Sequence, residues 1–203
     1  MIGILDVGVG NVAAIEGAYR RLILPSCRVT NARELSKISH LILPGVGSMG
    51  EYMSRIKHNN LYRDIINFAR SGFVFGICLG FQSLFEYSQE DDCEAFGFLS
   101  GSLNSLNPDT ESTNIGNYKL EKINECKFGV FSDADLSHAF YFTHSYYLPA
   151  SNPASLYAIY SPFKSYICAS VESPCGHIYG TQYHPELSHE AGRNILKRFS
   201  DLT

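Results

Sequence analysis

The sequence predicts an α/β fold in which a mostly parallel central sheet is flanked by helices. Short apolar runs alternate with segments of helical periodicity along most of the chain, which is typical of parallel sheets covered by helices. The run Phe73-Val74-Phe75 leads directly into Gly76-Ile77-Cys78-Leu79-Gly80, a strand-to-helix turn with a possible nucleophile between two glycines. The chain has 203 residues without a repeat or an obvious linker, so we expect residues 1–203 to form a single domain.

The first half of the chain supplies the start of the sheet. Strands are expected at residues 2–7, 28–30, 41–43 and 73–77. Helices are expected at residues 11–23, 49–57 and 61–71, the first because Val12, Ile15, Ala18, Tyr19 and Leu22 form one apolar stripe.

The second half is less regular. Strands are expected at residues 140–143, 156–160, 166–171 and 177–182, and a last helix at residues 188–199. Residues 90–92 and 104–117 are rich in Asp, Asn, Ser and Thr, so we expect loops there, beside short strands.

Composition excludes several classes of protein. The formal net charge is −4, so a nucleic-acid surface is not expected. The apolar runs are well under the roughly 20 residues of a membrane span, and residues 1–6 have no basic stretch ahead of them, so we expect a cytoplasmic protein. The six cysteines include no C-x-x-C pair, so we expect neither metal nor disulfide framework, and no cofactor.

Cys78 is the strongest candidate for a catalytic residue. Taken alone, a cysteine is more often a buried structural thiol. The flanking Gly76 and Gly80 favour a tight, strained turn, which we expect to expose the sulfur at the sheet edge. There the positive end of the following helix favours the thiolate, the reactive form.

A second motif, Gln182-Tyr183-His184-Pro185-Glu186, follows the last expected strand. A thiol nucleophile needs an imidazole that accepts its proton, and a third group that orients the imidazole. His184 and Glu186 have the right chemistry if the chain turns at Pro185. Alone the motif is also consistent with a surface turn, and only the combination with Cys78 makes it specific.

A third motif, Pro44-Gly45-Val46-Gly47-Ser48, also follows an expected strand. Backbone N–H groups of a glycine-rich turn can stabilise a developing oxyanion, and the N–H of Leu79 is the expected second donor. The alternative is an ordinary strand-to-helix turn. Gly8 and Gly10 suggest a dinucleotide fingerprint, but the expected acidic residue is missing near Thr30, which excludes nucleotide binding.

The three motifs together resemble the class I (triad) glutamine amidotransferases, and among them the glutaminase subunits of imidazole glycerol phosphate synthase. The likeness covers nearly the whole chain. It rests on Asp6-Val7-Gly8-Val9-Gly10-Asn11, Leu43-Pro44-Gly45-Val46-Gly47, Gly76-Ile77-Cys78-Leu79-Gly80-Phe81-Gln82, His144-Ser145-Tyr146-Tyr147 and Gly180-Thr181-Gln182-Tyr183-His184-Pro185-Glu186.

The resemblance implies a flavodoxin-like three-layer fold and a role for each matching residue. Cys78 attacks the side-chain amide of glutamine, His184 shuttles protons and Glu186 orients His184. The oxyanion hole is formed by Val46, Gly47 and Leu79. The residues implied to hold glutamine are Gln82, Glu90, His144, Ser145 and Tyr146.

The resemblance also implies a partner. Ammonia passes to a cyclase barrel subunit, which makes imidazole glycerol phosphate and an aminoimidazole carboxamide ribotide for histidine biosynthesis. The residues implied to face this partner are Asn11, Asn114, Ile115, Gly116, Asn117 and Tyr118. Here the family pattern has Pro-His-Ile-Gly-Trp-Asn, whereas this chain keeps Ile115-Gly116 without the His or the Trp.

This departure leaves alternatives open. A paralogous subunit could supply ammonia for amidation or amidination of nucleotide-linked sugars in surface polysaccharide or flagellin glycan synthesis. A stand-alone γ-glutamyl hydrolase, a non-catalytic relative and a glutaminase of vitamin B6 synthesis fit less well, the last because it has Pro-Gly-Gly-Glu-Ser at the oxyanion turn.

Overall fold

An eight-stranded sheet forms the centre of the computed structural model, which describes residues 1–107 and 112–203. Its strand order is β2-β1-β3-β4-β14-β13-β12-β9. The strands are β2 (Ser26–Val29), β1 (Ile2–Leu5), β3 (His40–Leu43), β4 (Phe73–Ile77), β14 (Ile178–Thr181), β13 (Tyr166–Glu172), β12 (Ser155–Tyr160) and β9 (Glu121–Lys122). The first five strands are parallel and the last three are added in antiparallel pairs. The expected mostly parallel sheet is thus confirmed.

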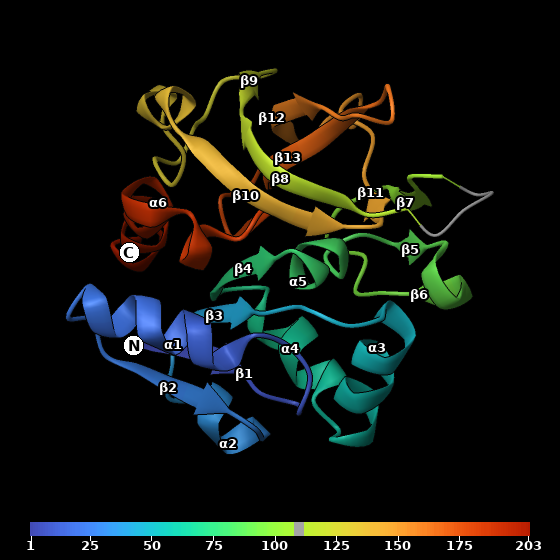
Figure 1. Cartoon of the computed structure of the whole chain (residues 1–203). Coiled ribbons are helices and arrows are strands. Elements are labelled where there is room, and N and C mark those ends of the chain that lie inside the picture. Colours follow the sequence, from blue (N-terminus) through green and yellow to red (C-terminus); the bar gives the residue numbers. More distant parts are fainter. Residues whose placement is uncertain (108–111) are drawn as a thin grey trace.

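Helices cover both faces of the parallel part, because its strands are apolar on both sides. Ile42 and Phe75 face the core beneath α1 (Val12–Arg21) and α6 (His189–Ser200). Leu43 and Val74, at neighbouring positions, face the opposite core. That core is closed by α2 (Ala32–Leu35), α3 (Met49–His58) and α4 (Tyr62–Phe68). The arrangement of helices, sheet and helices gives three layers (Figure 1).

The segment at residues 104–117 is more ordered than expected. The structure places strands β7 (Ser102–Ser105) and β8 (Asn114–Lys119) in the region that we expected to be a loop, and residues 108–111 of that segment lie outside the described residues. The loop prediction was therefore wrong at both ends. These strands are hard to recognise in the sequence because their residues are mostly polar. Their backbone hydrogen bonds are made to strands from elsewhere in the chain.

Those partners belong to two smaller sheets. β8 pairs in antiparallel fashion with β10 (Ala139–His144), so that Ile115 lies opposite Thr143. β7 pairs with β11 (Tyr146–Tyr147) and β5 (Tyr87–Ser88), and β5 continues to β6 (Cys93–Glu94). Figure 1 shows the long β10–β8 ribbon running above α5 (Leu79–Gln82), the helix that follows β4. In the part of the chain that the structure describes, no helix is long and apolar enough to cross a membrane.

Candidate active site

Cys78 lies at the turn between β4 and α5 with a strained backbone, at φ 52° and ψ −105°. The flanking glycines are needed because three segments meet here. A Cβ on Gly80 would lie 1.8 Å from the carbonyl oxygen of Leu43, and a Cβ on Gly76 would lie 2.5 Å from that of Gly80. Sequence and structure therefore agree on a nucleophile-elbow geometry.

Two details of this turn differ from our expectation. The Cys78 side chain is buried, with 6% of its surface exposed, because the β10–β8 ribbon covers it: its Sγ donates to the carbonyl of Thr143 on β10, at 3.5 Å. The following helix has only four residues, and Leu84 and Phe85 lie beyond it in the core. The dipole of one turn is small, so stabilisation of a thiolate falls to neighbouring side chains.

His184 and Glu186 form a buried pair. His184 follows β14, and Glu186 lies in the short helix η3 (Pro185–Leu187). The Nδ1 of His184 is 2.7 Å from Oε1 of Glu186. Because the carboxylate can only accept, Nδ1 carries the proton and Nε2 is left to act as the base. Burial opposes charge on His184, but the adjacent Cys78 and Glu186 outweigh it and raise the pKa of His184 above its usual value.

The glycine-rich turn at residues 44–48 packs directly on the elbow. A Cβ on Gly45 would lie 2.2 Å from the Cβ of Leu79 and 2.4 Å from the backbone nitrogen of Gly80, so only glycine allows this contact. Gly47 has a φ of +122°, in the region that favours glycine. A Cβ on Gly47 would lie 3.2 Å from Val9, so the N-terminal motif lies against the same turn.

These segments enclose a cavity of about 250 Å³, which we call the Cys78 cavity. It contains every residue that we predicted for the oxyanion hole and for glutamine binding, whereas His184 and Glu186 are buried and do not belong to its lining. Its lining residues are Val46, Gly47, Cys78, Leu79, Gln82, Glu90, Thr113, Thr143, His144, Ser145 and Tyr146.

Glu90 connects the cavity to the glycine-rich turn. Its carboxylate accepts a hydrogen bond from the backbone N–H of Met49, the first residue of α3, at 3.0 Å. Asp91 accepts from the next N–H, that of Gly50, at 3.0 Å. Burial raises the pKa of Glu90, against the effect of the Met49 bond. The two carboxylates hold the start of α3, and thereby the end of the turn, in place.

His144 is buried and neutral. Its Nδ1 donates to the carbonyl of Tyr146 at 2.8 Å, while burial lowers its pKa to about 4. Its Nε2 lies 3.1 Å from Nδ2 of Asn114, and Ser145 shares a hydrogen bond of 2.9 Å with Thr113. His144 therefore shapes the cavity wall and does not serve as a base at neutral pH.

The residues that we predicted to face a partner are divided by the structure. Asn114 is 1% exposed and its side chain bonds to His144 and Tyr118, so that side chain is not available at a surface. Ile115, the next residue on β8, is 61% exposed. Asn117 is exposed, whereas Asn11, Gly116 and Tyr118 are half-buried.

Three further residues of the site were missed. Thr113 and Thr143 line the Cys78 cavity, and the side chain of Gln182 contacts both Gln82 and Cys78. Gln182 is the first residue of the second motif and Thr143 directly precedes His144, and these positions were the only available signal. Thr113 directly precedes Asn114, which we had assigned to the partner surface, and only the pairing of β8 with β10 brings it to the Cys78 cavity.

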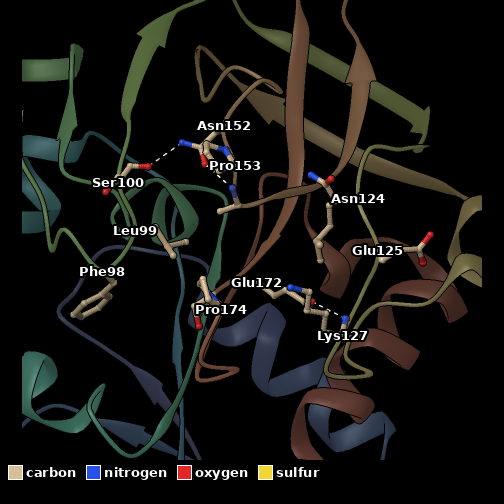
Figure 2. Close-up of a pocket in the computed structure, with 13 residues that line it drawn as sticks. Phe98, Leu99, Ser100, Asn124, Glu125, Lys127, Asn152, Pro153, Glu172 and Pro174 are labelled. Carbon is tan, nitrogen blue, oxygen red and sulfur yellow. Dashed lines mark hydrogen bonds between the residues drawn. The ribbon is translucent and has the colours of Figure 1, made fainter.

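A larger cavity, of about 690 Å³, contains none of the predicted site residues. Figure 2 shows the hydrogen bond from Asn152 to Ser100 on one side and that from the Lys127 backbone to Glu172 on the other. Its lining residues are Phe98, Leu99, Ser100, Asn124, Glu125, Lys127, Asn152, Pro153, Ala154, Leu156, Glu172, Ser173 and Pro174. Among residues 1–107 and 112–203, no group of His, Cys, Asp and Glu could hold a metal ion.

Comparison with known sequences gives a consistent result. The family model described as "Glutamine amidotransferase class-I" matches residues 4–201. The chain is 30% identical to the imidazole glycerol phosphate synthase subunit HisH of Leptospira interrogans, over the full length of both. It is 32% identical to the subunit of the same name from Bacillus thuringiensis, covering 100% of this chain and 95% of that one.

Solved structures share the fold at lower identity. A structure described as a glutamine amidotransferase has a TM-score of 0.73 at 16% identity and covers 98% of each chain. PurLQS from Thermotoga maritima has a TM-score of 0.75 at 18% identity, covering 98% of this chain and 97% of that one. These similarities establish the three-layer fold.

Proposed function

Since the chain belongs to the class-I glutamine amidotransferases, we propose that it hydrolyses L-glutamine at the Cys78 cavity and supplies the ammonia to a synthase subunit of histidine biosynthesis. The observation that carries this proposal is the combination of a strained cysteine elbow with a buried His184–Glu186 pair beside it. The relatives at 30–32% identity are named as subunits of imidazole glycerol phosphate synthase.

The chemistry follows from the positions of these groups. Nε2 of His184 takes the thiol proton, and the Cys78 sulfur attacks the side-chain amide carbon of glutamine. The oxyanion is stabilised by N–H groups of Leu79 and of the Val46–Gly47 turn. His184 returns its proton to the leaving nitrogen, the C–N bond breaks, and ammonia leaves a γ-glutamyl thioester. Water, deprotonated by His184, then releases glutamate and restores the thiol.

The polar groups that line the Cys78 cavity are complementary to those of glutamine. Glu90 and the side-chain oxygen of Gln82 can accept hydrogen bonds from the substrate's ammonium group. Ser145 and Tyr146 supply further polar groups in the same lining. Charged and polar contacts of this kind hold the substrate in register with the sulfur.

The partner surface is proposed around exposed apolar residues on the segments that carry the site, of which Val46 lines the Cys78 cavity. Val46 and Ile115 are 43% and 61% exposed, and Leu187, which follows Glu186 directly, is 46% exposed. A contiguous patch of exposed apolar side chains rimmed by polar ones is typical of docking surfaces, and we propose that these residues form one. Asn11, Gly116, Asn117 and Tyr118 complete the proposed surface, and Asn114 supports it from inside. The occupant is a cyclase barrel that converts the ammonia to imidazole glycerol phosphate and the carboxamide ribotide, in the cytoplasm.

The test is reconstitution with the partner. The tagged chain is used to isolate its partner from the source cells, and ammonia release and acceptor conversion are measured with and without that partner. We expect glutamine hydrolysis to be slow alone and strongly accelerated by the partner with its ligand. Formation of imidazole glycerol phosphate supports the proposal. A sugar-nucleotide product contradicts the histidine branch and favours the paralogous subunit, and full hydrolysis by the isolated chain indicates a stand-alone hydrolase.

A further inference from the structure

Gln182 is a buried side chain for which the proposed mechanism has no use. It follows β14 directly, it is fully buried, and its backbone N–H is bonded to the carbonyl of Ala169 on β13 at 2.9 Å. Its side chain lies between two residues of the site. One end is 3.2 Å from Nε2 of Gln82, and the other is 3.8 Å from the sulfur of Cys78.

Which end of Gln182 faces the sulfur follows from its neighbours. Nε2 of Gln82 lies 2.9 Å from the carbonyl oxygen of Tyr146. A carbonyl oxygen can only accept, so the amide nitrogen of Gln82 must point there. The same nitrogen then donates its second hydrogen to Oε1 of Gln182. The nitrogen of Gln182 is thereby left facing Cys78, as a donor.

The same Tyr146 carbonyl also orders a second series of hydrogen bonds in the wall of the cavity. The Tyr146 carbonyl also accepts from Nδ1 of His144, so Nε2 of His144 must accept and Asn114 must donate to it. The Asn114 oxygen in turn accepts from the hydroxyl of Tyr118, at 2.8 Å. Turning the Gln182 amide over would place its nitrogen against the nitrogen of Gln82 and an oxygen against the sulfur, so only the orientation described keeps both bonds of this side chain.

We propose that Gln182 is a further catalytic residue, whose side-chain amide donates a hydrogen bond to the Cys78 sulfur and stabilises the thiolate. This inference rests on the proposed role of Cys78 as the nucleophile. The distance of 3.8 Å suits a bond to the large sulfur atom, and hydrogen bonds to a charged acceptor are the strong ones.

The other contact of the sulfur explains why such a donor is needed. The Thr143 carbonyl accepts from Sγ at 3.5 Å, which is possible only while Cys78 keeps its proton. That carbonyl favours the thiol, and a one-turn helix does little to oppose it. The ionisable groups around the sulfur are His184 from the end of β14, backed by Glu186, with His144 from β10 and Glu90 from η1 (Glu90–Asp92) in the same cavity region. Gln182 adds an uncharged donor that operates at any pH.

The test is the pH profile of Cys78 alkylation in the full-length protein, measured by mass spectrometry of the Cys78 peptide so that the other five cysteines do not contribute. Gln182→Met removes the donor at similar volume. We expect the midpoint of the pH profile of Cys78 alkylation to rise by about one pH unit. Alkylation below that midpoint is then about tenfold slower. Hydrolysis of glutamine is expected to fall by at least the same factor.

Gln182→Glu separates the two contacts. A carboxylate still accepts from Gln82, so we expect KM to change less than in Gln182→Met, but it offers the sulfur a negative charge in place of a donor. The midpoint should therefore rise at least as far as in the Met variant. The matched control is Ser170→Ala, which removes another buried hydrogen bond, to the Tyr183 hydroxyl at 3.1 Å, without a contact to Cys78; its profile should match the wild type.

The inference would be overturned if the midpoint of the alkylation profile in folded Gln182→Glu lay within about 0.3 pH units of the wild type. This holds whether or not Gln182→Met also folds. The proposed function would still stand in that case, provided that Cys78→Ala abolishes hydrolysis. Conversely, hydrolysis that persists in Cys78→Ala contradicts the proposed function itself.

Discussion

The two cavities of this protein differ in the chemical groups that converge on them, and this difference does not follow their volumes. Among the described residues that line the larger one, at about 690 Å³, there is one buried carboxylate, that of Glu172, and no nucleophile–base pair. The Cys78 cavity, at about 250 Å³, has the end of a parallel strand, a strained turn and the β10–β8 ribbon converging on one sulfur atom. The difference teaches that chemistry depends on converging, oriented groups, and that the volume of a cavity is a poor guide to the site.

Of the variants that test this comparison of the two cavities, Cys78→Ala is expected to have the largest effect. We expect glutamine hydrolysis to fall by more than about 10⁴-fold, because the covalent route is lost. The measurement is ammonia release in the presence of the partner. Cys175→Ala, at an exposed cysteine, is the matched control and should retain full activity. Activity that survives in Cys78→Ala would remove the Cys78 cavity from consideration.

A smaller loss is expected for Gly45→Ala. The new Cβ would overlap Leu79 and Gly80, so the glycine-rich turn must move away from the elbow. Loss of an oxyanion donor costs about 10²- to 10³-fold in kcat. Gly17→Ala is the control, because its Cβ meets only the tip of Arg21, at 3.5 Å. If Gly45→Ala kept its kcat while circular dichroism showed a native fold, the turn would have no part in catalysis.

Glu186→Gln is expected to act through His184. Loss of the carboxylate removes one of the two interactions that raise the pKa of His184, so that pKa should fall, as measured by NMR of the imidazole. We expect kcat to fall by about a hundredfold, the lower end for general acid–base catalysis. An unchanged His184 titration would show that the 2.7 Å contact is not formed in solution.

The larger cavity gives the smallest effect. Glu172 is 6% exposed, its Oε1 accepts from Lys127 N at 2.6 Å, and burial raises its pKa above 4.5. Since the folded state holds this proton more tightly than the unfolded state, Glu172 lowers stability as pH rises from about 4.5 through its folded pKa.

Glu172→Gln should remove this decrease in stability with rising pH. We expect unfolding free energy at pH 7 to be unchanged or higher by up to about 1 kcal/mol, in urea titrations at several pH values. Glutamine hydrolysis should be unaffected. A large loss of hydrolysis in this variant would show that the larger cavity serves the reaction and would break the comparison.

The parallel core was predictable because its signals are local. Buried strands such as Phe73–Ile77 read as continuous apolar runs, and the Gly76–Gly80 elbow follows from tight-turn chemistry. The strand at residues 140–143 was predicted and corresponds to β10, but β8 and β7 were not predictable, since their polar residues pair with partners far along the chain. The burial of Cys78 was missed for the same reason: it depends on a ribbon that comes from residues 114–144.

The sequence by itself therefore determined the fold class, and it supplied the three residues that we propose as the reactive ones, Cys78, His184 and Glu186. Each is marked by neighbours within a few positions, and glycine or proline at such turns has few physical alternatives. Only the tertiary structure decided what surrounds the sulfur. The directions of the bonds from Tyr118 through Asn114, His144 and Gln82 to Gln182 are set by donors and acceptors that meet across separate strands, and no local pattern encodes that meeting.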